Sequence, residues 1–151
     1  MSQTDKQVIG QIGENCAVAY LERHGYKVID RNYRKKYGEI DIVATKQGIL
    51  HFVEVKSISA PVSEVKPPGV RGSTSKFSHE TDPDDDDYEA EENVHPWKLK
   101  RLRRVIEAYL LSKYPNDEDE EPDWQLDVVT VQVDREARVG RVRMLEDIDI
   151  C

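Results

Sequence analysis

Three ionisable residues on two neighbouring predicted strands have the types and spacing of a catalytic group. Asp41 lies in the segment GEIDIVA, and Glu54 and Lys56 lie in the segment FVEVK. Side chains two positions apart on a strand point to the same face, so Glu54 and Lys56 share one face while Val53 and Val55 pack on the other. A short hairpin joins the two strands, which predicts that Asp41 and Glu54 lie side by side.

This combination suits the hydrolysis of a phosphodiester. Two carboxylates can hold Mg²⁺ or Mn²⁺ through hard oxygen ligands and leave positions for water and phosphate. Lys56 can orient the attacking water or stabilise developing negative charge. Glu14, on the first predicted helix, could reach the same patch and bind or orient the ion. The predicted catalytic set is Asp41, Glu54, Lys56 and Glu14, with Asp41, Glu54 and Glu14 as metal ligands.

Hydrophobic periodicity predicts the elements that position these residues. Apolar residues at helical spacing favour helices over residues 5–24 and from Pro96 to just before Pro115. Strands are expected over residues 26–33, 38–45, 49–57, 124–133 and 139–145, with Gly48 in a tight turn. On the second strand Glu39 and Asp41 should share one face, and Ile40 and Ile42 the other. The expected fold is α/β, with a helix, a three-stranded antiparallel meander, a second helix and a returning strand forming a mixed sheet flanked by helices.

The acidic residues are concentrated in two segments. The 151-residue chain has a net charge of -8, but residues 80–92 hold nine acidic side chains and residues 117–123 hold six. Without these segments, 15 acidic and 22 basic residues remain, so the body of the protein is basic. The pattern predicts a single domain over residues 1–151, with a flexible acidic insertion at about 59–93 and an acidic loop at about 115–123. The insertion is either a solubilising loop or a mimic of DNA that covers the basic face.

A basic body favours a polyanionic partner, and the bases form two groups. The predicted nucleic-acid-binding residues are Arg31, Arg34, Lys35, Lys36, Lys98, Lys100, Arg101 and Arg104. Tyr33 and Tyr37 could stack on an exposed base, although packing of their hairpin is the simpler interpretation. Trp97 and Trp124 are expected in or at the edge of the core, and His51 is expected to be buried and hydrogen-bonded.

Several classes of protein are excluded by composition. No apolar segment approaches the roughly 20 residues of a membrane span, and the first residues show no secretory signal. Two cysteines, at positions 16 and 151, make neither a disulfide framework nor a zinc cluster. We therefore expect a cytoplasmic protein without membrane contact.

The ordered motifs of the chain together resemble the YraN-like family of predicted endonucleases. Asp41 followed by Glu-Val-Lys at 54–56 resembles the PD-(D/E)xK signature of restriction-endonuclease-like nucleases. The further motifs are GEN at 13–15, RNYR at 31–34, GEIDIVA at 38–44, FVEVK at 52–56, the helix around Lys98, and LDVV at 126–129. This family is similar to archaeal Holliday-junction resolvases, so the resemblance implies a restriction-endonuclease-like fold and a metal-dependent DNA endonuclease with Asp41, Glu54, Lys56 and Glu14 in its site. Branched or structured DNA is a candidate substrate, and cutting a junction would require a homodimer.

The sequence departs from the family in two places and leaves alternatives open. The insertion at residues 59–93 replaces a short loop, and Leu99 stands where a Gln commonly follows the matched Lys98. Asp41, Glu54 and Lys56 could instead form a solvated cross-strand salt bridge, Glu14 a helix-surface charge, and Glu39 a surface or supporting carboxylate. The protein as a whole could instead be a non-catalytic nucleic-acid-binding module, or an interaction protein that acts through its acidic loops.

Overall fold

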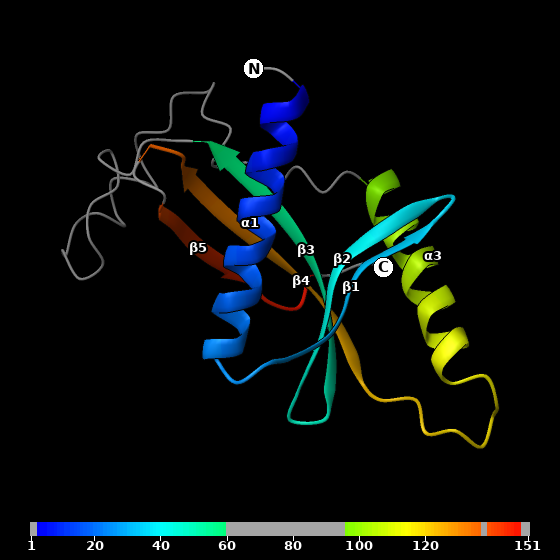
Figure 1. The fold of residues 1–151 in the computed structure, drawn as a ribbon. Helices are drawn as coiled ribbons and strands as arrows, with labels where there is room; N and C mark the ends of the chain where they lie inside the picture. The colour runs from blue at the N-terminus through cyan, green and yellow to red at the C-terminus, as the bar shows by residue number, and fades with distance from the viewer. Residues whose placement is uncertain (1–2, 60–95, 137–138, 149–151) are drawn as a thin grey trace.

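The computed structural model describes residues 3–59, 96–136 and 139–148, and these form two helices and five strands (Figure 1). The elements are α1 (Gln3–Arg23), β1 (Lys27–Lys35), β2 (Gly38–Lys46), β3 (Ile49–Ser59), α3 (Pro96–Lys113), β4 (Trp124–Asp134) and β5 (Val139–Leu145). The predicted elements are confirmed in type and order, and their ends differ from the predicted ends by a few residues at most. The predicted insertion lies almost entirely outside the described residues.

The five strands form one mixed sheet in the order β1-β2-β3-β4-β5. β1, β2 and β3 pair antiparallel as the predicted meander, β3 and β4 pair in parallel, and β5 returns antiparallel to β4. The parallel pairing requires a crossover between β3 and β4, and α3 lies within that connection. The predicted mixed α/β sheet flanked by helices is therefore confirmed.

A two-residue turn fixes the register of β2 and β3. Gln47 and Gly48 have φ angles of 52° and 78°, and Lys46 pairs with Ile49 across them. Positive φ at both central residues is the backbone of a type I′ hairpin turn, whose twist matches that of the strands. The turn thereby sets Ile42 opposite Val53, one residue short of Asp41 and Glu54.

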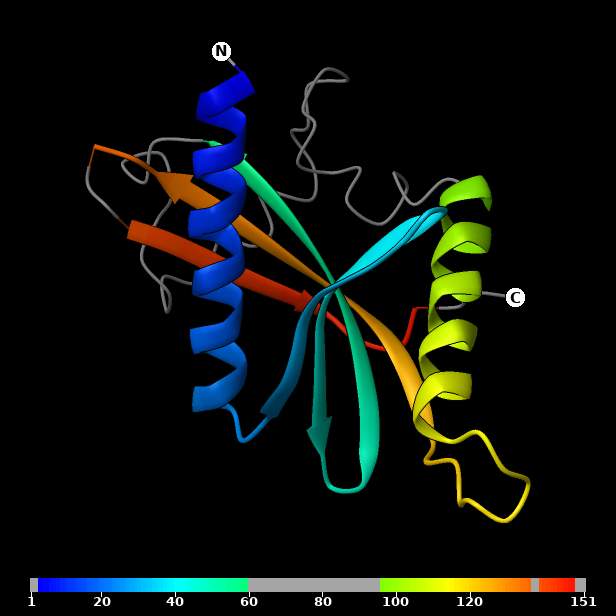
Figure 2. The same cartoon turned by 45° about the vertical axis from the view of Figure 1, so that its right-hand side comes forward.

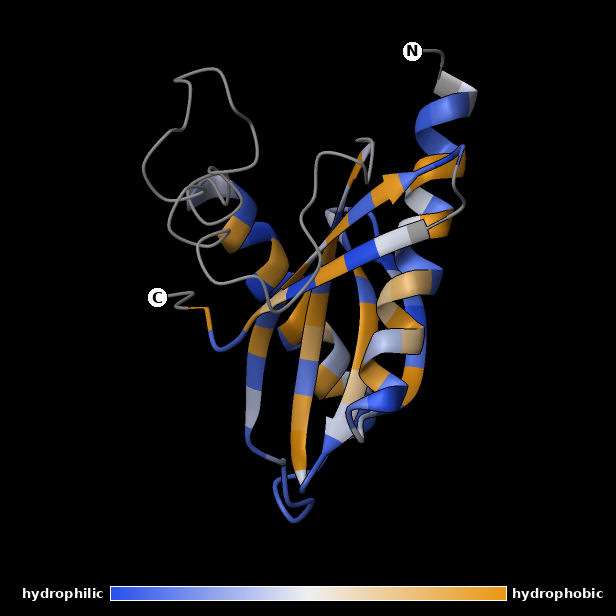
Figure 3. Cartoon of the chain, turned by 90° about the vertical axis from the view of Figure 1, so that its left-hand side faces the viewer, coloured by the Kyte–Doolittle hydropathy of each residue, from blue (hydrophilic) through white to orange (hydrophobic). Residues whose placement is uncertain are grey.

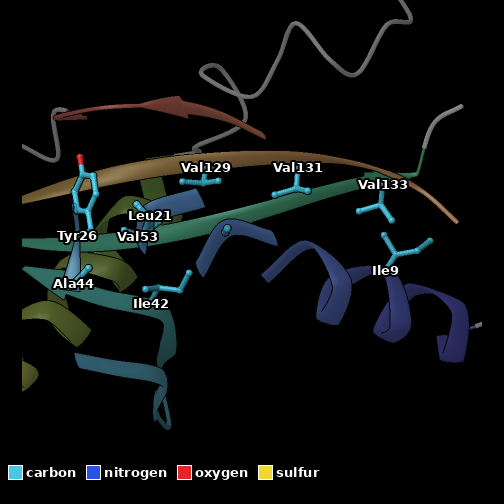
Figure 4. Close-up of a cluster of buried hydrophobic side chains, with 10 residues drawn as sticks. Ile9, Leu21, Tyr26, Ile42, Ala44, Val53, Val129, Val131 and Val133 are labelled. Atoms are coloured by element: carbon cyan, nitrogen blue, oxygen red, sulfur yellow. The ribbon is translucent and has the colours of Figure 1, made fainter. Parts of the chain in front are cut away.

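The two helices cover different parts of the sheet and enclose two hydrophobic clusters. α1 packs on β3, β4 and β5, and its cluster includes Leu21, Val53, Val129 and Val131 (Figure 4). α3 packs on β2, and its cluster includes Phe52 and Tyr109. Hydrophobic segments recur along the strands and on α1 (Figure 3). Each helix therefore covers one face of the sheet, α1 over β3, β4 and β5 and α3 over β2.

The alternation predicted along β2 is wrong at the position of Asp41. Ile40 belongs to the cluster under α3, whereas Ile42 belongs to the cluster under α1, so the two isoleucines do not share a face. On the neighbouring strand β1, Asn32 has a φ of 52°, in the left-handed region that a strand residue rarely adopts. Asn32 lies between the pairs Arg31–Ile42 and Tyr33–Ile40, so this unusual backbone angle occurs beside the position where the burial pattern of β2 changes.

β2 and β3 separate beyond the pair Ile42–Val53, and this point is called the fork below. The outer half of β2 runs to α3, while the outer half of β3 continues beside β4 under α1 (Figure 2). Gly38, at the start of β2, packs so closely on α3 that an added Cβ would lie 2.9 Å from Val105 Cγ2. The fork is therefore held open by a different helix on each branch.

Two further expectations concern exposed segments. The acidic segment before β4 is mostly exposed, with Asn116 and Asp119 bonded to each other across it. Trp124 lies at the edge of the core against Phe52, but Trp97 is 56% exposed, so its expected place in or at the edge of the core is wrong. Trp97 precedes the first buried position of α3, Leu102, by more than one turn. Neither of the two described helices has the length and apolar character needed to cross a lipid bilayer.

Candidate active site at the fork of the sheet

Asp41 and Glu54 lie at the fork. Asp41 directly precedes Ile42 in the chain and Glu54 directly follows Val53, the last residues of β2 and β3 that pair with each other. The Val55 backbone N–H donates a hydrogen bond of 2.8 Å to Asp41 Oδ2. A carboxylate thus replaces the backbone acceptor that a continued ladder would have supplied. The strand separation and the position of Asp41 are parts of the same local structure.

The environment of Asp41 disfavours its negative charge. Burial, then repulsion by the Glu54 carboxylate, raise the pKa of Asp41 to about 8, and a hydrogen bond with Glu39 acts in the same direction. The bond from Val55 N–H opposes this rise. Among the described residues, no Lys, Arg or His is within ion-pair distance of Asp41. Two carboxylates that repel each other in a half-buried position are a donor set that a divalent cation can stabilise.

Glu54 is paired with the helix on the other side of the fork. Lys98 Nζ lies 3.0 Å from Glu54 Oε1, and the Glu54 side chain is only 18% exposed. Lys98 was expected to contact nucleic acid, but here its ammonium group compensates the charge of a predicted metal ligand. α3 is therefore connected to the candidate site through one side chain.

Lys56 lines a cavity beside the fork. The cavity has a volume of about 1090 Å³ and lies between the first half of α1 and the separated strands. Asp41, Val55 and Lys56 line it together, whereas Glu54 does not line it and has its carboxylate paired with Lys98 of α3. Asp41 and Lys56 thus reach a common space large enough for part of a polymeric substrate.

Glu14 lines the same cavity from α1 but is held by β1. Its Oε1 accepts hydrogen bonds from Arg31 Nε at 3.1 Å and from Asn32 Nδ2 at 3.0 Å. Within residues 3–59, 96–136 and 139–148, no three His, Cys, Asp or Glu side chains are grouped closely enough to hold one ion. The structure therefore brings Asp41 and Glu54 together without Glu14, whose place among the metal ligands stays a prediction.

A glycine allows α1 to approach the site strand. A Cβ on Gly13 would overlap the Ser57 side chain of β3, and Gly13 is buried. Any larger residue would lift this part of α1 away from β3 and move Glu14 with it. The other glycine of α1, Gly10, is not needed for such an approach, because its Cβ would meet nothing within 4 Å.

Two of the predicted nucleic-acid-binding residues, Arg31 and Arg34, form ion pairs with carboxylates that line the cavity. Arg31 bonds Glu14 and Asn15, and Arg34 Nε lies 2.6 Å from Glu39 Oε2. Farther from the fork, the predicted nucleic-acid-binding residues Lys35, Lys36, Lys100, Arg101 and Arg104 are all exposed. Three of them lie over aromatic rings: Lys35 over Tyr33, Arg101 over Trp97 and Arg104 over Tyr37.

Glu39 and Asn32 belong to the site more closely than the sequence suggested. Glu39 lines the cavity and is bonded to both Asp41 and Arg34. Its position two residues before Asp41 was the available signal, because such residues share a strand face. Asn32 gave no signal, since its role depends on an unusual backbone angle.

A second polar cluster lies in the core and is separate from the cavity lining. Asp127 is fully buried and accepts hydrogen bonds from His51 Nδ1 at 2.6 Å, Gln125 Nε2 at 2.8 Å and the Asp147 backbone N–H at 2.9 Å. The expectation of a buried, bonded His51 is confirmed. These bonds connect β3, β4 and the segment after β5, so the cluster stabilises the sheet.

Together, the fold and the site define a mixed α/β protein with a carboxylate pair and a lysine at a fork in its sheet. The chain belongs to the uncharacterised protein family UPF0102, whose model matches residues 13–131. It is 38% identical over 127 residues to a UPF0102 protein of Alkaliphilus oremlandii, covering 83% of this chain and 85% of the relative. It is 30% identical over 122 residues to a UPF0102 protein of Campylobacter hominis, covering 81% of each chain. The matched region contains Asp41, Glu54 and Lys56, and the resemblance to the YraN-like family is confirmed at the level of the family.

Proposed function

We propose that this protein is a metal-dependent DNA endonuclease with a restriction-endonuclease-like fold. The observation that carries the proposal is the meeting of Asp41 and Glu54 at the fork, with Asp41 and Lys56 lining one cavity. A solvated salt bridge, the main alternative, is disfavoured because Lys56 makes no ion pair with Asp41 or Glu54. The two carboxylates instead repel each other, which is the arrangement that a cation would stabilise.

The donor set fits Mg²⁺ or Mn²⁺. Asp41 and Glu54 would hold the ion, and the hard oxygen ligands of both match its preference. When bound, the ion would neutralise charge on the phosphate and lower the pKa of a bound water. The mutual repulsion of the two carboxylates would decrease at the same time, since a positive charge would lie between them.

Each protein group then has a defined task. Lys56, in the cavity beside Asp41, would hold the attacking water or the phosphate oxygen that gains charge. Val55 N–H fixes the orientation of the Asp41 carboxylate. Glu14 and Arg31 brace α1 against β1 at the edge of the cavity. When substrate binds, the Lys98 ammonium group would leave Glu54 and pair with a DNA phosphate instead.

DNA is the proposed partner because α3 and the β1–β2 hairpin both carry exposed basic residues and lie against each other, with Gly38 packed on Val105 and the Arg104 guanidinium over the Tyr37 ring. Contacts to phosphates carry no sequence information directly, so cleavage should depend little on base sequence. Branched or structured DNA remains the proposed substrate class, and action on a junction would require a homodimer.

A cleavage assay tests the proposal. Labelled linear duplex, single-stranded, nicked and four-way-junction DNA are each incubated with the protein and Mg²⁺, Mn²⁺ or EDTA. We expect products only with a divalent ion, and their loss in Glu54→Ala and Lys56→Ala. Glu107→Ala, which removes an exposed carboxylate paired with Arg103 on the outside of α3, is the matched control and should cleave normally.

Two results would contradict the proposal. Cleavage that survives both site substitutions would reject the site and indicate a contaminating nuclease. DNA that is bound but never cut, with either metal, would favour the non-catalytic binding module instead.

A further inference from the structure

Two aromatic residues and two arginines form a row across the start of α3 and the tip of the β1–β2 hairpin. The Arg101 guanidinium lies 5.2 Å from the centre of the Trp97 ring, and the Arg104 guanidinium lies 4.5 Å from the centre of the Tyr37 ring. We call Trp97, Arg101, Arg104 and Tyr37 the aromatic row. It consists of two pairs, each with one aromatic ring and one guanidinium group, and the two arginines lie between the rings.

Helix geometry explains the row. Trp97, Arg101 and Arg104 are spaced four and three residues apart, so they lie on one face of α3. The adjoining face is buried, with Leu102 and Val105 in the cluster under the helix. Gly38 packs against Val105 and the Arg101 backbone, which brings the preceding residue, Tyr37, to the helix.

The exposure of Trp97 is unusual for so large an apolar side chain. Trp97 is 56% exposed even with Arg101 beside it, whereas the other tryptophan, Trp124, packs against Phe52 at the edge of the core. An exposed indole contributes little to folding, but it offers a flat surface on which another ring can stack. The row therefore has a surface suited to a planar ligand.

The charge of α3 selects the kind of planar ligand. The helix carries Lys98, Lys100, Arg101, Arg103, Arg104 and Lys113, and its acidic residue is Glu107. Aromatic rings beside Lys and Arg side chains suit a chain of nucleotides, because the nucleobases stack on the rings while the phosphates contact the cations. A planar ligand without phosphates would have no anionic group to pair with the Lys and Arg side chains of α3.

We propose that the aromatic row binds unpaired nucleotides of DNA and leads a single-stranded segment to the fork. In duplex DNA each base already stacks on its neighbours, so only an unpaired base can offer a free face to Trp97. Lys98 follows Trp97 in the chain and contacts Glu54, so a strand bound on the row lies next to the carboxylate pair. This inference rests on the proposed function and narrows its substrate to DNA that contains single-stranded segments.

Binding measured in EDTA tests the row separately from cleavage. Fluorescence anisotropy is recorded for a labelled 20-nucleotide oligo-dT and for a labelled 20-base-pair duplex. Trp97→Ala should weaken oligo-dT binding roughly five- to hundredfold, the range expected for one lost base stack, and leave duplex binding nearly unchanged. Trp97→Phe should recover most of the loss. Leu111→Ala, at a 68% exposed apolar residue of the same helix, is the control and should bind both DNAs normally.

A direct optical signal complements the affinities. Because the chain has only two tryptophans, Trp124→Phe leaves Trp97 as the single indole. Oligo-dT should quench the fluorescence of this variant at the concentrations that shift the anisotropy, since stacking brings a base against the ring.

The outcomes separate this inference from the proposed function. Equal weakening of oligo-dT and duplex by Trp97→Ala, or no weakening of either, would overturn the stacking role even if the protein cleaves DNA. Selective loss of oligo-dT binding in a protein that never cleaves would support the row and reject the endonuclease.

Discussion

Lys98 of α3 and Glu54 of β3 form an ion pair of 3.0 Å across the fork of the sheet. The pair neutralises one of the two carboxylates that were predicted to share a metal ion, and no base is in ion-pair distance of the other within the described chain. A cation bound between Asp41 and Glu54 would therefore compete with Lys98 for Glu54. Because of this competition, the affinity of the site for a divalent ion should depend on Lys98, which does not line the cavity.

Removal of the Lys98 charge should tighten the binding of a divalent ion. In Lys98→Met, Mn²⁺ affinity measured by titration calorimetry should increase roughly 1.5- to fivefold, the range for losing one partly exposed charge interaction. Lys113→Met is the control, since Lys113 lies on the same helix and faces Asp30 instead. Equal Mn²⁺ affinity in wild type and Lys98→Met would show that Glu54 does not hold the ion.

Protonation of Asp41 should make the stability of the metal-free protein fall as pH rises. The folded state raises the pKa of Asp41 from 3.8 to about 8, so between these values the folded protein binds more protons than the unfolded chain. The stabilising contribution is complete below about pH 4 and is lost as pH increases through about 8.

Asp41→Asn isolates this effect. Its melting temperature in EDTA should exceed that of wild type at pH 8.5 but not at pH 4.5, by roughly 2–4 °C for each kcal/mol of repulsion removed. A difference between the two proteins that is constant with pH would contradict the assigned environment of Asp41.

Two glycines of α1 should respond oppositely to alanine. Gly10→Ala should stabilise the protein by roughly 0.5–1 kcal/mol, because its Cβ meets nothing and alanine favours helix. Gly13→Ala should destabilise it by roughly 1–3 kcal/mol, because its Cβ overlaps Ser57 in a packed interface. Urea unfolding gives both free energies, and effects of the same sign would show that α1 does not approach β3 as described.

Asp127 should be required for stability although its carboxylate does not line the cavity. Asp127→Ala leaves three buried or half-buried donors without their acceptor, which should cost at least about 3 kcal/mol in urea unfolding. Asp127→Asn, which keeps one acceptor oxygen, should cost less. The control Glu118→Ala, in the exposed loop before β4, should change stability by less than about 0.5 kcal/mol. A small cost for Asp127→Ala would mean that the cluster does not hold the strands together.

Much of the fold could be predicted from local patterns in the sequence. The apolar stripe of α3 and the alternation of β4 reflect short-range periodicity, and Gly48 after Gln47 marks the turn that fixes the β2–β3 register. The position of Asp41 beside Glu54 follows from that register. These features depend on residues within one hairpin or one helix, so the sequence carries them directly.

The features that sequence reasoning missed depend on contacts between distant segments. The break between Ile40 and Ile42 lies beside the left-handed backbone of Asn32 on another strand, and the two isoleucines belong to clusters under different helices. The pairing of Lys98 with Glu54 joins elements 44 positions apart in the chain. Helix periodicity placed Lys98 on a basic surface, but it could not indicate which carboxylate that surface meets.

The most direct test of the central claim, that Asp41 and Glu54 share one divalent ion, is the anomalous scattering from a crystal of the protein soaked in Mn²⁺. The account predicts a single strong peak at the fork, within coordination distance of both carboxylates, and its loss in Glu54→Ala. A peak confined to the acidic loop before β4, or no peak at the fork in crystals that bind Mn²⁺ elsewhere, would contradict it.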